Sequence, residues 1–300
     1  MKTLDEIRLK IKSLEAIPAV PAIVHPLISM LQLPSDEVDL EKVVELVSYD
    51  AGIAAQCLRM SNSPLFGRRN TETVRSAIVA LGLKRVQAIL LSCCMNQIVP
   101  HGKWALDPTT FWRHALGCAL VSRKLATLIA YPDPEKVYLA GLLHDLGILV
   151  NTIACTEEYR ECFRLARENH IALDRIEAQV LGFTHCQSGK ILAQQWRFSA
   201  EVIEVVEFHH NPSAAPTASS LVSLVYLSDL LCRLRDLGYG YYESMGVDLA
   251  GDDCWAILVN QCPALVNVDL ARLTMDIDGA MQDIVALVDA VFKPEVAALA

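Results

Sequence analysis

The sequence predicts an all-α fold. Apolar residues recur with a period of about 3.6 in nearly every segment, which indicates amphipathic helices. Runs of alternating β-branched residues, which would indicate strands, are almost absent. The chain has 300 residues, 53% of them apolar, so it can bury the core of one large domain or two compact ones. We therefore expect a multi-helix core without a sheet.

The first hundred residues are expected to form an N-terminal helical subdomain. Pro18 and Pro21 break the chain before its second helix, and Thr71 and Gly82 are expected to cap and to end the fifth. The helices of this half are predicted over residues 2–15, 22–34, 40–47, 50–62, 72–81 and 84–97. The loop 100–108 carries proline and glycine and is the best candidate for the boundary of this subdomain, 1–100.

The second half, 101–237, is predicted to begin with a long helix that Thr109 or Thr110 caps and that ends near Ile129. The segment 131–136 (YPDPEK) forms a turn and a helix start, and the pair His144-Asp145 is expected inside the helix that follows. Further helices are predicted over 157–169, 174–181, 184–196, 199–208 and 218–237. A C-terminal extension, 238–300, starts loosely and returns to helical patterning over about 254–292.

Composition and charge exclude several classes of protein. No apolar run reaches the roughly 20 residues that span a bilayer, and the N-terminus alternates charges, so we expect a cytoplasmic protein without a membrane segment. The net charge of −9 argues against nucleic acid as a partner. A local basic patch could still form from Arg68, Arg69, Arg75, Lys84 and Arg85. Ten cysteines without a CxxC pair fit buried, reduced thiols.

The most informative feature is the pair His144-Asp145, which lies in the apolar stretch 141–150 (GLLHDLGILV). Two ionisable side chains are costly there unless something pairs with them, and a metal ion is the best partner. Seven nitrogen and oxygen ligands could converge on it: His114, His144, Asp145, His185, His209, His210 and Asp229. One or two divalent ions are expected, and these donors suit iron, manganese, nickel or zinc about equally.

The adjacent pair His209-His210 favours two ions over one. Successive residues of an α-helix point about 100° apart, so both imidazoles cannot easily enter one small ligand sphere. A carboxylate can bridge two ions, which gives this role to Asp145. In a hydrolase, the gap between two such ions holds a hydroxide that attacks phosphorus, and Asp145 would then be a catalytic residue.

Each ligand taken singly has a simpler explanation. His114 could be a core histidine with satisfied hydrogen bonds, and His185 could be an exposed or capping residue. The pair His209-His210 ends a helix, where cationic side chains meet the helix dipole favourably. Asp229 could pair with Arg233 four residues on. The joint order H, HD, H, HH, D nevertheless favours metal binding. The remaining histidines show no comparable context: His25, His101 and His170.

This order resembles the HDOD family, the HD-related output domains of bacterial signalling proteins, and through it the HD superfamily of metal-dependent phosphohydrolases. The likeness extends to the segments 17–33, 48–67 and 76–86. It is carried in the second of these by Asp50, Leu58, Arg59, Asn62, Ser63 and Phe66. The resemblance covers about residues 10–235, and it implies an HD-like helical core that holds metal through the seven residues named above.

Departures from the active relatives bear on catalysis. The HD-GYP branch, which hydrolyses cyclic di-GMP, places its metal ligands in the same order, but active relatives commonly read HDxGK. Here Ile148 replaces the lysine that would meet a substrate phosphate. The GYP signature is absent after His210, and Thr110 stands where some relatives have a glutamate. The resemblance therefore implies a signal-transduction output domain that keeps a metal site without catalysis. The alternative is a phosphohydrolase acting on a nucleotide or cyclic dinucleotide.

The resemblance also bears on partners. HDOD domains are often fused to receiver or cyclic-nucleotide domains, for which 300 residues leave no room, so we expect a stand-alone domain that contacts a signalling protein. The extension 238–300 could cover the core, form a homodimer or bind that partner. Binding of DNA or RNA through Arg68, Arg69 and Lys84 is the weakest hypothesis, because the chain as a whole is acidic.

Overall fold

The structure is a computed structural model, and every regular element that it describes is a helix, which confirms the all-α prediction. The described residues are 5, 30, 33, 37–48, 51–66, 71–86, 89–90, 104–240, 251–262, 265 and 268–292. The predicted helices 2–15 and 22–34 and most of 84–97 lie outside them. So do several residues singled out in the sequence: His25, Asp50, Arg68, Arg69 and His101.

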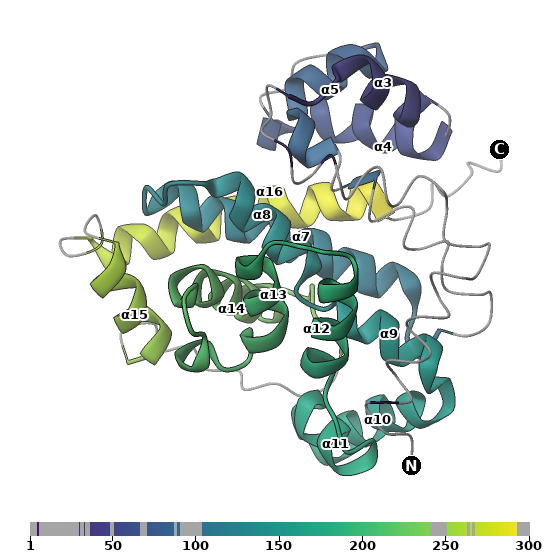
Figure 1. Cartoon of the computed structure of the whole chain (residues 1–300). Helices are drawn as coiled ribbons and strands as arrows, with labels where there is room; N and C mark the ends of the chain where they lie inside the picture. Colours follow the sequence, from purple (N-terminus) through teal and green to yellow (C-terminus); the bar gives the residue numbers. More distant parts are fainter. Residues whose placement is uncertain are drawn as a thin grey trace, which may run out of the picture.

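Three helices of the N-terminal half pack against one another at one end of the molecule (Figure 1). They are α3 (Leu40–Ser48), α4 (Ala51–Ser61) and α5 (Val74–Leu81), with the 3-10 turn η1 (Pro64–Phe66) after α4. The predicted ranges of α3 and α4 are confirmed to within a residue or so. Gly82 ends α5 with a φ of 90°, as its backbone freedom allows.

The predicted cap of α5 is wrong. The hydroxyl of Thr73, not that of Thr71, accepts the backbone N–H of Ser76 at 3.2 Å, and α5 starts two residues later than expected. Thr71 instead donates its backbone N–H to Asn62 Oδ1 at 2.6 Å. The Thr71 hydroxyl donates to the same oxygen at 3.0 Å, so it is held at the end of α4 and does not cap α5.

The second half is built around α7 (Pro108–Leu128). Its cap is Asp107, which accepts the backbone N–H of Thr110 at 2.8 Å, so the prediction of Thr109 or Thr110 is wrong. Pro108 suits the first helical position because a proline there loses no hydrogen bond. The next helix, α8 (Pro134–Leu143), begins in the same way with Asp133 as its cap, and it packs along α7.

Six further helices complete this half, and the predicted helices are confirmed to within a few residues. They are α9 (Leu146–Ala154), α10 (Thr156–Asn169), α11 (Leu173–Val180), α12 (His185–Gln195), α13 (Ala200–Phe208) and α14 (Ser219–Arg233), with the 3-10 turn η2 (Pro212–Ala214) before α14. Helix α12 packs on α9 and α13, while α14 packs on α7 and α8. These contacts bring the predicted ligand-bearing segments together in the interior.

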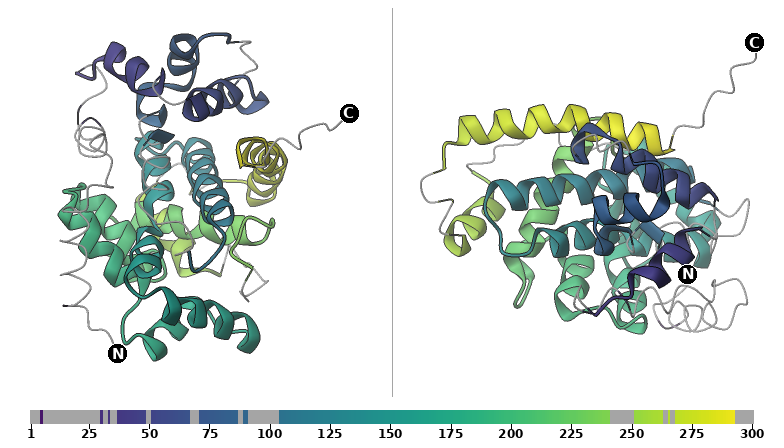
Figure 2. Two further views of the ribbon diagram at one scale, coloured as in Figure 1. Left: turned by 90° about the vertical axis from the view of Figure 1, so that its right-hand side faces the viewer. Right: turned by 90° about the horizontal axis from the view of Figure 1, so that it is seen from above.

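Among the described residues of the C-terminal region, two helices follow, α15 (Asp253–Gln261) and α16 (Leu270–Phe292). Helix α16 lies along α7 and reaches α4, and both views of Figure 2 show it covering this side of the molecule. Arg113 of α7 donates to Asp289 of α16 at 2.5 Å. Helix α16 thus covers the core, which is one of the three roles suggested for the extension 238–300. The domain boundaries at 100/101 and 237/238 stay predictions.

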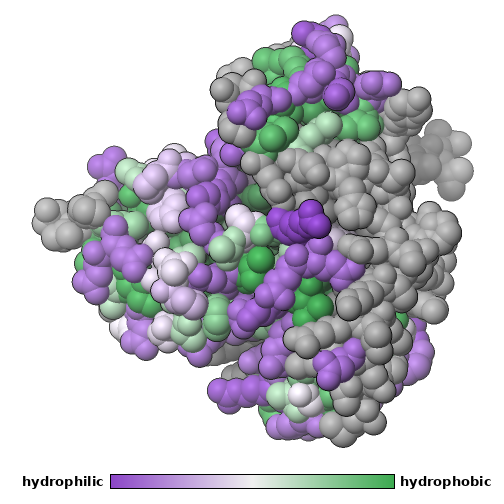
Figure 3. All heavy atoms as spheres, in the orientation of Figure 1, coloured by the Kyte–Doolittle hydropathy of each residue, from purple (hydrophilic) through white to green (hydrophobic). Residues whose placement is uncertain are grey.

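Apolar packing fills the interior, and the largest fully buried side chains include Tyr138, Tyr159 and Phe183. On the face seen in Figure 3, polar and apolar residues are interspersed. The stretch Pro134–Ala154 has the length and the mean hydropathy, 1.5, of a membrane span, but 89% of its most apolar window is buried inside the protein. That stretch, which contains His144 and Asp145, belongs to the core of this fold.

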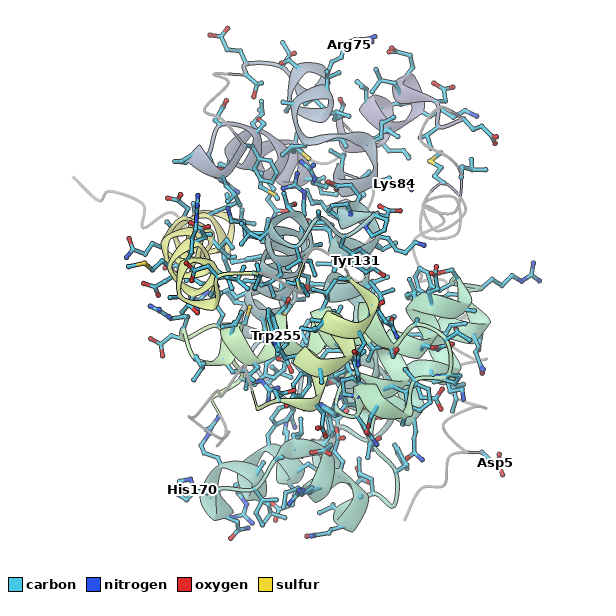
Figure 4. All side chains as sticks on the ribbon, turned by 90° about the vertical axis from the view of Figure 1, so that its left-hand side faces the viewer. Asp5, Arg75, Lys84, Tyr131, His170 and Trp255 are labelled. Atoms are coloured by element: carbon cyan, nitrogen blue, oxygen red, sulfur yellow. The ribbon has the colours of Figure 1, made fainter. Side chains whose placement is uncertain are left out.

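Part of the predicted basic patch, His170 and most of the cysteines lie within the described residues. Of the described members of the basic patch, Arg75 pairs with Glu41, and Arg85 pairs with Glu135 at 2.6 Å. His170 is exposed at the end of α10, with a φ of 55°, and it lies at the opposite end of the molecule from Arg75 (Figure 4). All the cysteines within the described ranges are buried free thiols, as predicted.

Candidate metal centre

The structure brings all seven candidate ligands together in the interior of the second half. Helix α7 supplies His114, the junction of α8 and α9 supplies the HD pair, and α12, α13 and α14 supply the others. Six of the seven side chains belong to residues that are at most 4% exposed, and the seventh, His210, is half-buried. We call this cluster of seven residues the cage. Binding of metal by these residues stays a prediction.

The pair His144-Asp145 lies at a break between two helices, so the prediction that it lies inside one helix is wrong. His144 follows the last residue of α8, and Asp145 precedes α9 with a φ of −96° and a ψ of 22°. The break has a geometric consequence, because adjacent side chains of a continuous helix would diverge by about 100°. Here Asp145 Oδ2 lies 3.1 Å from His144 Nε2, so both side chains face one centre.

One half of the cage, which we call the first subsite, is formed by His114, His144, Asp229 and one carboxylate oxygen of Asp145. His114 Nε2 lies 3.3 Å from His144 Nε2 and 3.3 Å from Asp229 Oδ1. Asp145 Oδ2 lies 3.5 Å from His114 Nε2. Two imidazoles and two carboxylates therefore face one point.

The other half, the second subsite, is formed by His185, His209, His210 and the remaining oxygen of Asp145. His185 Nε2 lies 3.2 Å from His209 Nε2 and 3.0 Å from His210 Nε2. Asp145 Oδ1 lies 3.4 Å from His185 Nε2 and 3.3 Å from His209 Nε2. Asp145 thus turns one oxygen to each subsite, which is the placement that a bridging carboxylate requires.

The opposite ring nitrogens of four histidines are committed to other partners. His114 Nδ1 lies 2.7 Å from Leu237 O, and His144 Nδ1 lies 2.7 Å from Gly141 O. His209 Nδ1 lies 3.1 Å from Val206 O. Since a carbonyl oxygen can only accept, each Nδ1 carries a proton in this network, which leaves Nε2 as the atom that would bind an ion.

The fourth histidine, His185, is held by a buried carboxylate that the sequence analysis missed. Glu177 is fully buried, and its Oε2 accepts both the Nδ1–H of His185 at 2.7 Å and the backbone N–H of His185 at 2.8 Å. Tyr159 donates its hydroxyl to the other oxygen at 2.6 Å. Glu177 shares the apolar face of α11 with Leu173 and Ile176, and a carboxylate on such a face is the signal that could have revealed it.

This donor set fits divalent metal ions. Nitrogen lone pairs that converge at 3.0–3.3 Å repel one another unless a cation lies between them. A tetrahedral ion with metal–nitrogen bonds of about 2.0–2.1 Å separates its nitrogen ligands by about 3.3 Å. The outer hydrogen bonds to carbonyls and to Glu177 are those that orient metal-binding imidazoles. Bound ions would supply charge neutralisation and would cross-link six helices: α7, α8, α9, α12, α13 and α14.

Electrostatics within the cage favour ionised carboxylates. Burial opposes the ionisation of Asp145, but the imidazoles of His144, His114 and His209 outweigh it and hold its pKa well below the usual value. The pKa of Asp229 is lowered in the same way against burial, chiefly by Arg233. Arg233 pairs with Asp229 Oδ2 while Oδ1 faces His114, so the predicted i,i+4 pair coexists with a ligand role.

Two thiols that were outside the predicted set lie beside the cage, one at each subsite. Cys118 Sγ lies 3.5 Å from His114 Nε2, and Cys186 Sγ lies 3.9 Å from His209 Nε2. Burial raises the pKa of Cys118 well above its usual value. Burial also opposes ionisation of Cys186, but His209 and His185 lower its pKa to about 7. Cys118 is one helical turn after His114, and this spacing could have revealed it.

Close approach of two helix backbones sets the distance between Asp145 and the second subsite. A Cβ atom on Gly147 of α9 would lie 1.7 Å from His185 O and 2.8 Å from the backbone nitrogen of Gly189 on α12. Only a residue without a side chain fits there. Gly147 therefore allows α9, which follows Asp145, to lie directly against the helix that starts with His185.

Tyr239 covers the cage at the end of the chain segment that follows α14. Its hydroxyl donates to Asp145 Oδ2 at 2.7 Å, and its ring lies 4.3 Å from that of His114. Tyr239 also forms part of the lining of a surface pocket of about 350 Å³ between α10 and the start of α7. None of the seven ligands lines that pocket. Tyr239 was not among the predicted site residues, because it lies in a segment that showed no helical pattern.

Ile148 and Thr110, the two residues that differ from those of active relatives, have structural roles. Ile148 is 1% exposed and belongs to the hydrophobic core. Thr110 donates its hydroxyl to Asp107 at 3.0 Å in the cap of α7. Neither side chain supplies a charge at the cage.

The fold and the site together define a class of helical proteins with a cage of histidines and aspartates where six helices meet. Within this class, the HDOD domain model matches residues 17–212, and the chain belongs to the HDOD family. This confirms the resemblance seen in the sequence.

A curated relative with a similar sequence is an uncharacterized protein of Treponema pallidum (strain Nichols). It is 26% identical over 237 residues, which make up 77% of this chain and 45% of that protein. This chain therefore spans less than half the length of that relative.

Solved structures share the fold. An HDOD domain protein of unknown function from Geobacter sulfurreducens has a TM-score of 0.80 and 26% identity over 97% of this chain and 98% of its own. A candidate signal transduction protein from Marinobacter aquaeolei VT8 has a TM-score of 0.70 and 21% identity over 93% of this chain and 60% of its own. A candidate phosphohydrolase from Shewanella amazonensis SB2B has a TM-score of 0.69 and 20% identity, with coverages of 95% and 98%. The similarity to the Geobacter protein extends into the C-terminal helices.

Proposed function

We propose that the chain is a signal-transduction output domain whose cage holds one or two divalent ions as a structural centre and does not turn over a phosphate ester. Membership of the HDOD family supports the signalling role. The Marinobacter protein, which shares this fold, is described as a candidate signal transduction protein. The Shewanella protein, which also shares this fold, is described as a candidate phosphohydrolase.

The observation that carries the non-catalytic part of the proposal is the position of Tyr239. A hydrolase that uses two ions must admit a phosphate to the gap beside the bridging carboxylate. In this chain the phenol of Tyr239 donates to that carboxylate, Asp145, and Tyr239 also lines the 350 Å³ pocket, which none of the seven ligands lines. A phosphate in this pocket would therefore contact Tyr239 and none of the seven ligands.

The donor count supports the same conclusion. Structural zinc sites have four protein ligands, whereas catalytic sites keep one position open for water. Each subsite faces four donors from the chain when one oxygen of Asp145 is counted in each. The buried Ile148 adds no cation for a substrate phosphate. Metal binding in such a closed site contributes to folding stability.

The alternative function, a phosphohydrolase acting on a nucleotide or cyclic dinucleotide, has one specific observation in its favour. Asp145 divides its two oxygens between the subsites, which is also the arrangement of a hydrolase with a bridging carboxylate. In that mechanism the ions would supply an activated hydroxide, and Asp145 would hold them in position. Tyr239 would then have to move away from Asp145 before substrate could enter.

Metal analysis and a substrate panel test the proposal. Protein purified without chelators is expected to carry about one to two equivalents of a transition metal, and a content below about a tenth of an equivalent would contradict the metal centre. The loaded protein is then assayed with phosphodiester, nucleotide and cyclic dinucleotide substrates, and no turnover above the Asp145→Asn background is expected. Turnover that Asp145→Asn abolishes would establish the hydrolase instead.

In the proposed function the output is contact with a signalling protein or with a second copy of the chain. Light scattering over a range of protein concentrations distinguishes these, because association between copies increases the measured mass with concentration. A mass that stays at 33.0 kDa would exclude the homodimer and leave a different protein as the partner.

A further inference from the structure

We propose that Cys186 is a ligand of the second subsite, so that this subsite binds a borderline-soft ion such as Zn²⁺ through three imidazoles and one thiolate. This inference rests on the proposed metal centre and goes beyond its seven ligands. The donor atoms of His185, Cys186, His209 and His210 all lie within 4.8 Å of one another. Cys186 is 8% exposed and directly follows His185 at the start of α12.

The distances among these four donors suit a tetrahedral ion. With bonds of about 2.3 Å to sulfur and 2.0–2.1 Å to nitrogen, tetrahedral angles place sulfur and nitrogen about 3.6 Å apart and two nitrogens about 3.3 Å apart. Cys186 Sγ lies 3.9 Å from His209 Nε2, and the nitrogens lie 3.0 and 3.2 Å apart. Shifts of a few tenths of an ångström would complete the coordination. Asp145 Oδ1, 3.3 Å from His209 Nε2, then serves as a further donor shared with the first subsite.

Distance alone does not distinguish Cys186 from Cys118, whose Sγ lies 3.5 Å from His114 Nε2. Charge does. The first subsite already contains the carboxylates of Asp145 and Asp229, which neutralise a divalent ion, so a thiolate there would add a third negative charge. The second subsite has three neutral imidazoles and shares only Asp145. A thiolate there gives this subsite a negative charge of its own, and the cage then has three anionic ligands for the four positive charges of two divalent ions.

The position of each cysteine in its helix gives the same answer. Cys186 is the second residue of α12, where the unpaired backbone N–H groups and the helix dipole favour a negatively charged sulfur. Cys118 lies in the middle of α7, where every backbone N–H is used within the helix. Thiolate ligands select zinc or other soft ions over manganese and magnesium. The two subsites are therefore expected to prefer different metals.

Cobalt spectroscopy of the full-length chain tests this assignment without any assay of activity. Metal is removed with a chelator, and the protein is reconstituted with Co²⁺ alone. Visible d–d bands report binding of Co²⁺ to any donors, and a near-ultraviolet charge-transfer band reports a thiolate ligand. We expect both in the wild type. Cys186→Ser should lose the charge-transfer band and keep d–d bands, and the matched variant Cys118→Ser should keep both.

Three outcomes would overturn the assignment, and they differ from failure of the metal centre itself. The d–d bands without a charge-transfer band in the wild type would show a metal centre without sulfur. A band that survives in Cys186→Ser would place the sulfur elsewhere, and loss of the band in Cys118→Ser alone would assign it to the first subsite. The absence of all cobalt bands would overturn both the ligand and the metal centre.

A measurement on the wild type keeps the proposal testable if Cys186→Ser fails to fold. X-ray absorption spectroscopy of the zinc-loaded chain is expected to show a sulfur shell at about 2.3 Å beside the nitrogen and oxygen shells. A zinc spectrum with light-atom ligands only would contradict the assignment.

Discussion

The two subsites of the cage share Asp145 but differ in the chemistry of their other donors. The first combines two imidazoles with Asp229 and is completely buried, whereas the second has three imidazoles, one of them the half-buried His210. Oxygen-rich sites suit harder ions, and nitrogen- and sulfur-rich sites suit softer ones. In the proposed metal centre, one carboxylate would thus join two sites of different ion preference.

The subsites also differ in what orients their histidines. In the first, the backbone carbonyls of Leu237 and Gly141 hold His114 and His144. In the second, the side chain of Glu177 holds His185. Substitution of a residue keeps its backbone carbonyl but can remove its side-chain carboxylate. A single substitution of Glu177 can therefore weaken the second subsite and leave the first intact.

Removal of the shared carboxylate should have the largest effect, because it acts on both subsites. Asp145→Asn is expected to reduce the bound metal from about one to two equivalents to below a tenth. The amide keeps the shape of the side chain but loses the charge that faces four imidazoles. Elemental analysis of the purified variant measures the loss. Asp283→Asn, at an exposed position on α16, is the control and should retain its metal. Full metal occupancy in Asp145→Asn would show that neither subsite needs the carboxylate of Asp145.

A methyl group at the junction of the subsites should have the next largest effect. Gly147→Ala places a Cβ atom 1.7 Å from His185 O, so α9 and α12 must move apart. We expect a loss of about 3 kcal/mol in the free energy of unfolding, measured by urea denaturation, together with loss of metal from the second subsite. Gly279→Ala on α16 meets nothing within 4 Å and should be neutral or stabilising by up to about 1 kcal/mol. Equal effects of the two substitutions would contradict this prediction.

Substitution of the orienting carboxylate should separate the two subsites. Glu177→Gln is expected to weaken metal binding at the second subsite by about 10–100-fold, because the charge that supports His185 is lost. Binding at the first subsite should be unchanged. Competition titration with a chromophoric chelator resolves the two affinities. Glu161→Gln removes an exposed carboxylate from α10 and should change neither. A parallel loss at both subsites would mean that Glu177 supports the fold as a whole.

Removal of the tyrosine hydroxyl should have the smallest effect and should act on the first subsite. Tyr239→Phe loses the hydrogen bond to Asp145 Oδ2 and is expected to lower the free energy of unfolding by about 1–2 kcal/mol, with both ions retained. Thermal or urea unfolding of the loaded protein measures the change. Tyr226→Phe is the matched control, since its hydroxyl makes a longer contact of 3.4 Å with Asp252 and should cost less. Loss of metal from Tyr239→Phe would make Tyr239 part of the first subsite.

Much of the fold could be predicted because it depends on local patterns. The helix period and the breakers predicted α3, α4, α7 and the helices from α10 to α14 to within a few residues. The errors lie at caps and at the break between α8 and α9, which was expected to be one helix around His144-Asp145. Thr71 and Thr110 looked like caps of α5 and α7, but Thr73 and Asp107 serve, since the competing threonines are engaged elsewhere. A cap depends on which hydrogen bonds the surrounding chain leaves open, and a sequence does not show these.

The candidate site, like the fold, has a part that the sequence predicts and a part that it does not. The order H, HD, H, HH, D was visible in the sequence, and the structure brings those seven residues together. The partners that orient or cover them were not predicted, although Glu177 has a local signal, a carboxylate on an apolar helix face. Glu177, Tyr239 and Cys186 have no spacing that marks them as a set, and they reach the cage only because α11, the segment after α14, and α12 pack around it.

The sequence by itself thus determined the class of fold and the residue types of the cage, because helical periodicity and a spaced set of histidines and aspartates are properties of the chain. The tertiary structure decided how those residues are divided. The break at His144-Asp145 turns two neighbouring side chains to one centre, and contact through Gly147 sets the distance to His185. Such distances depend on the packing of helices far apart in the sequence, and only the folded chain defines them.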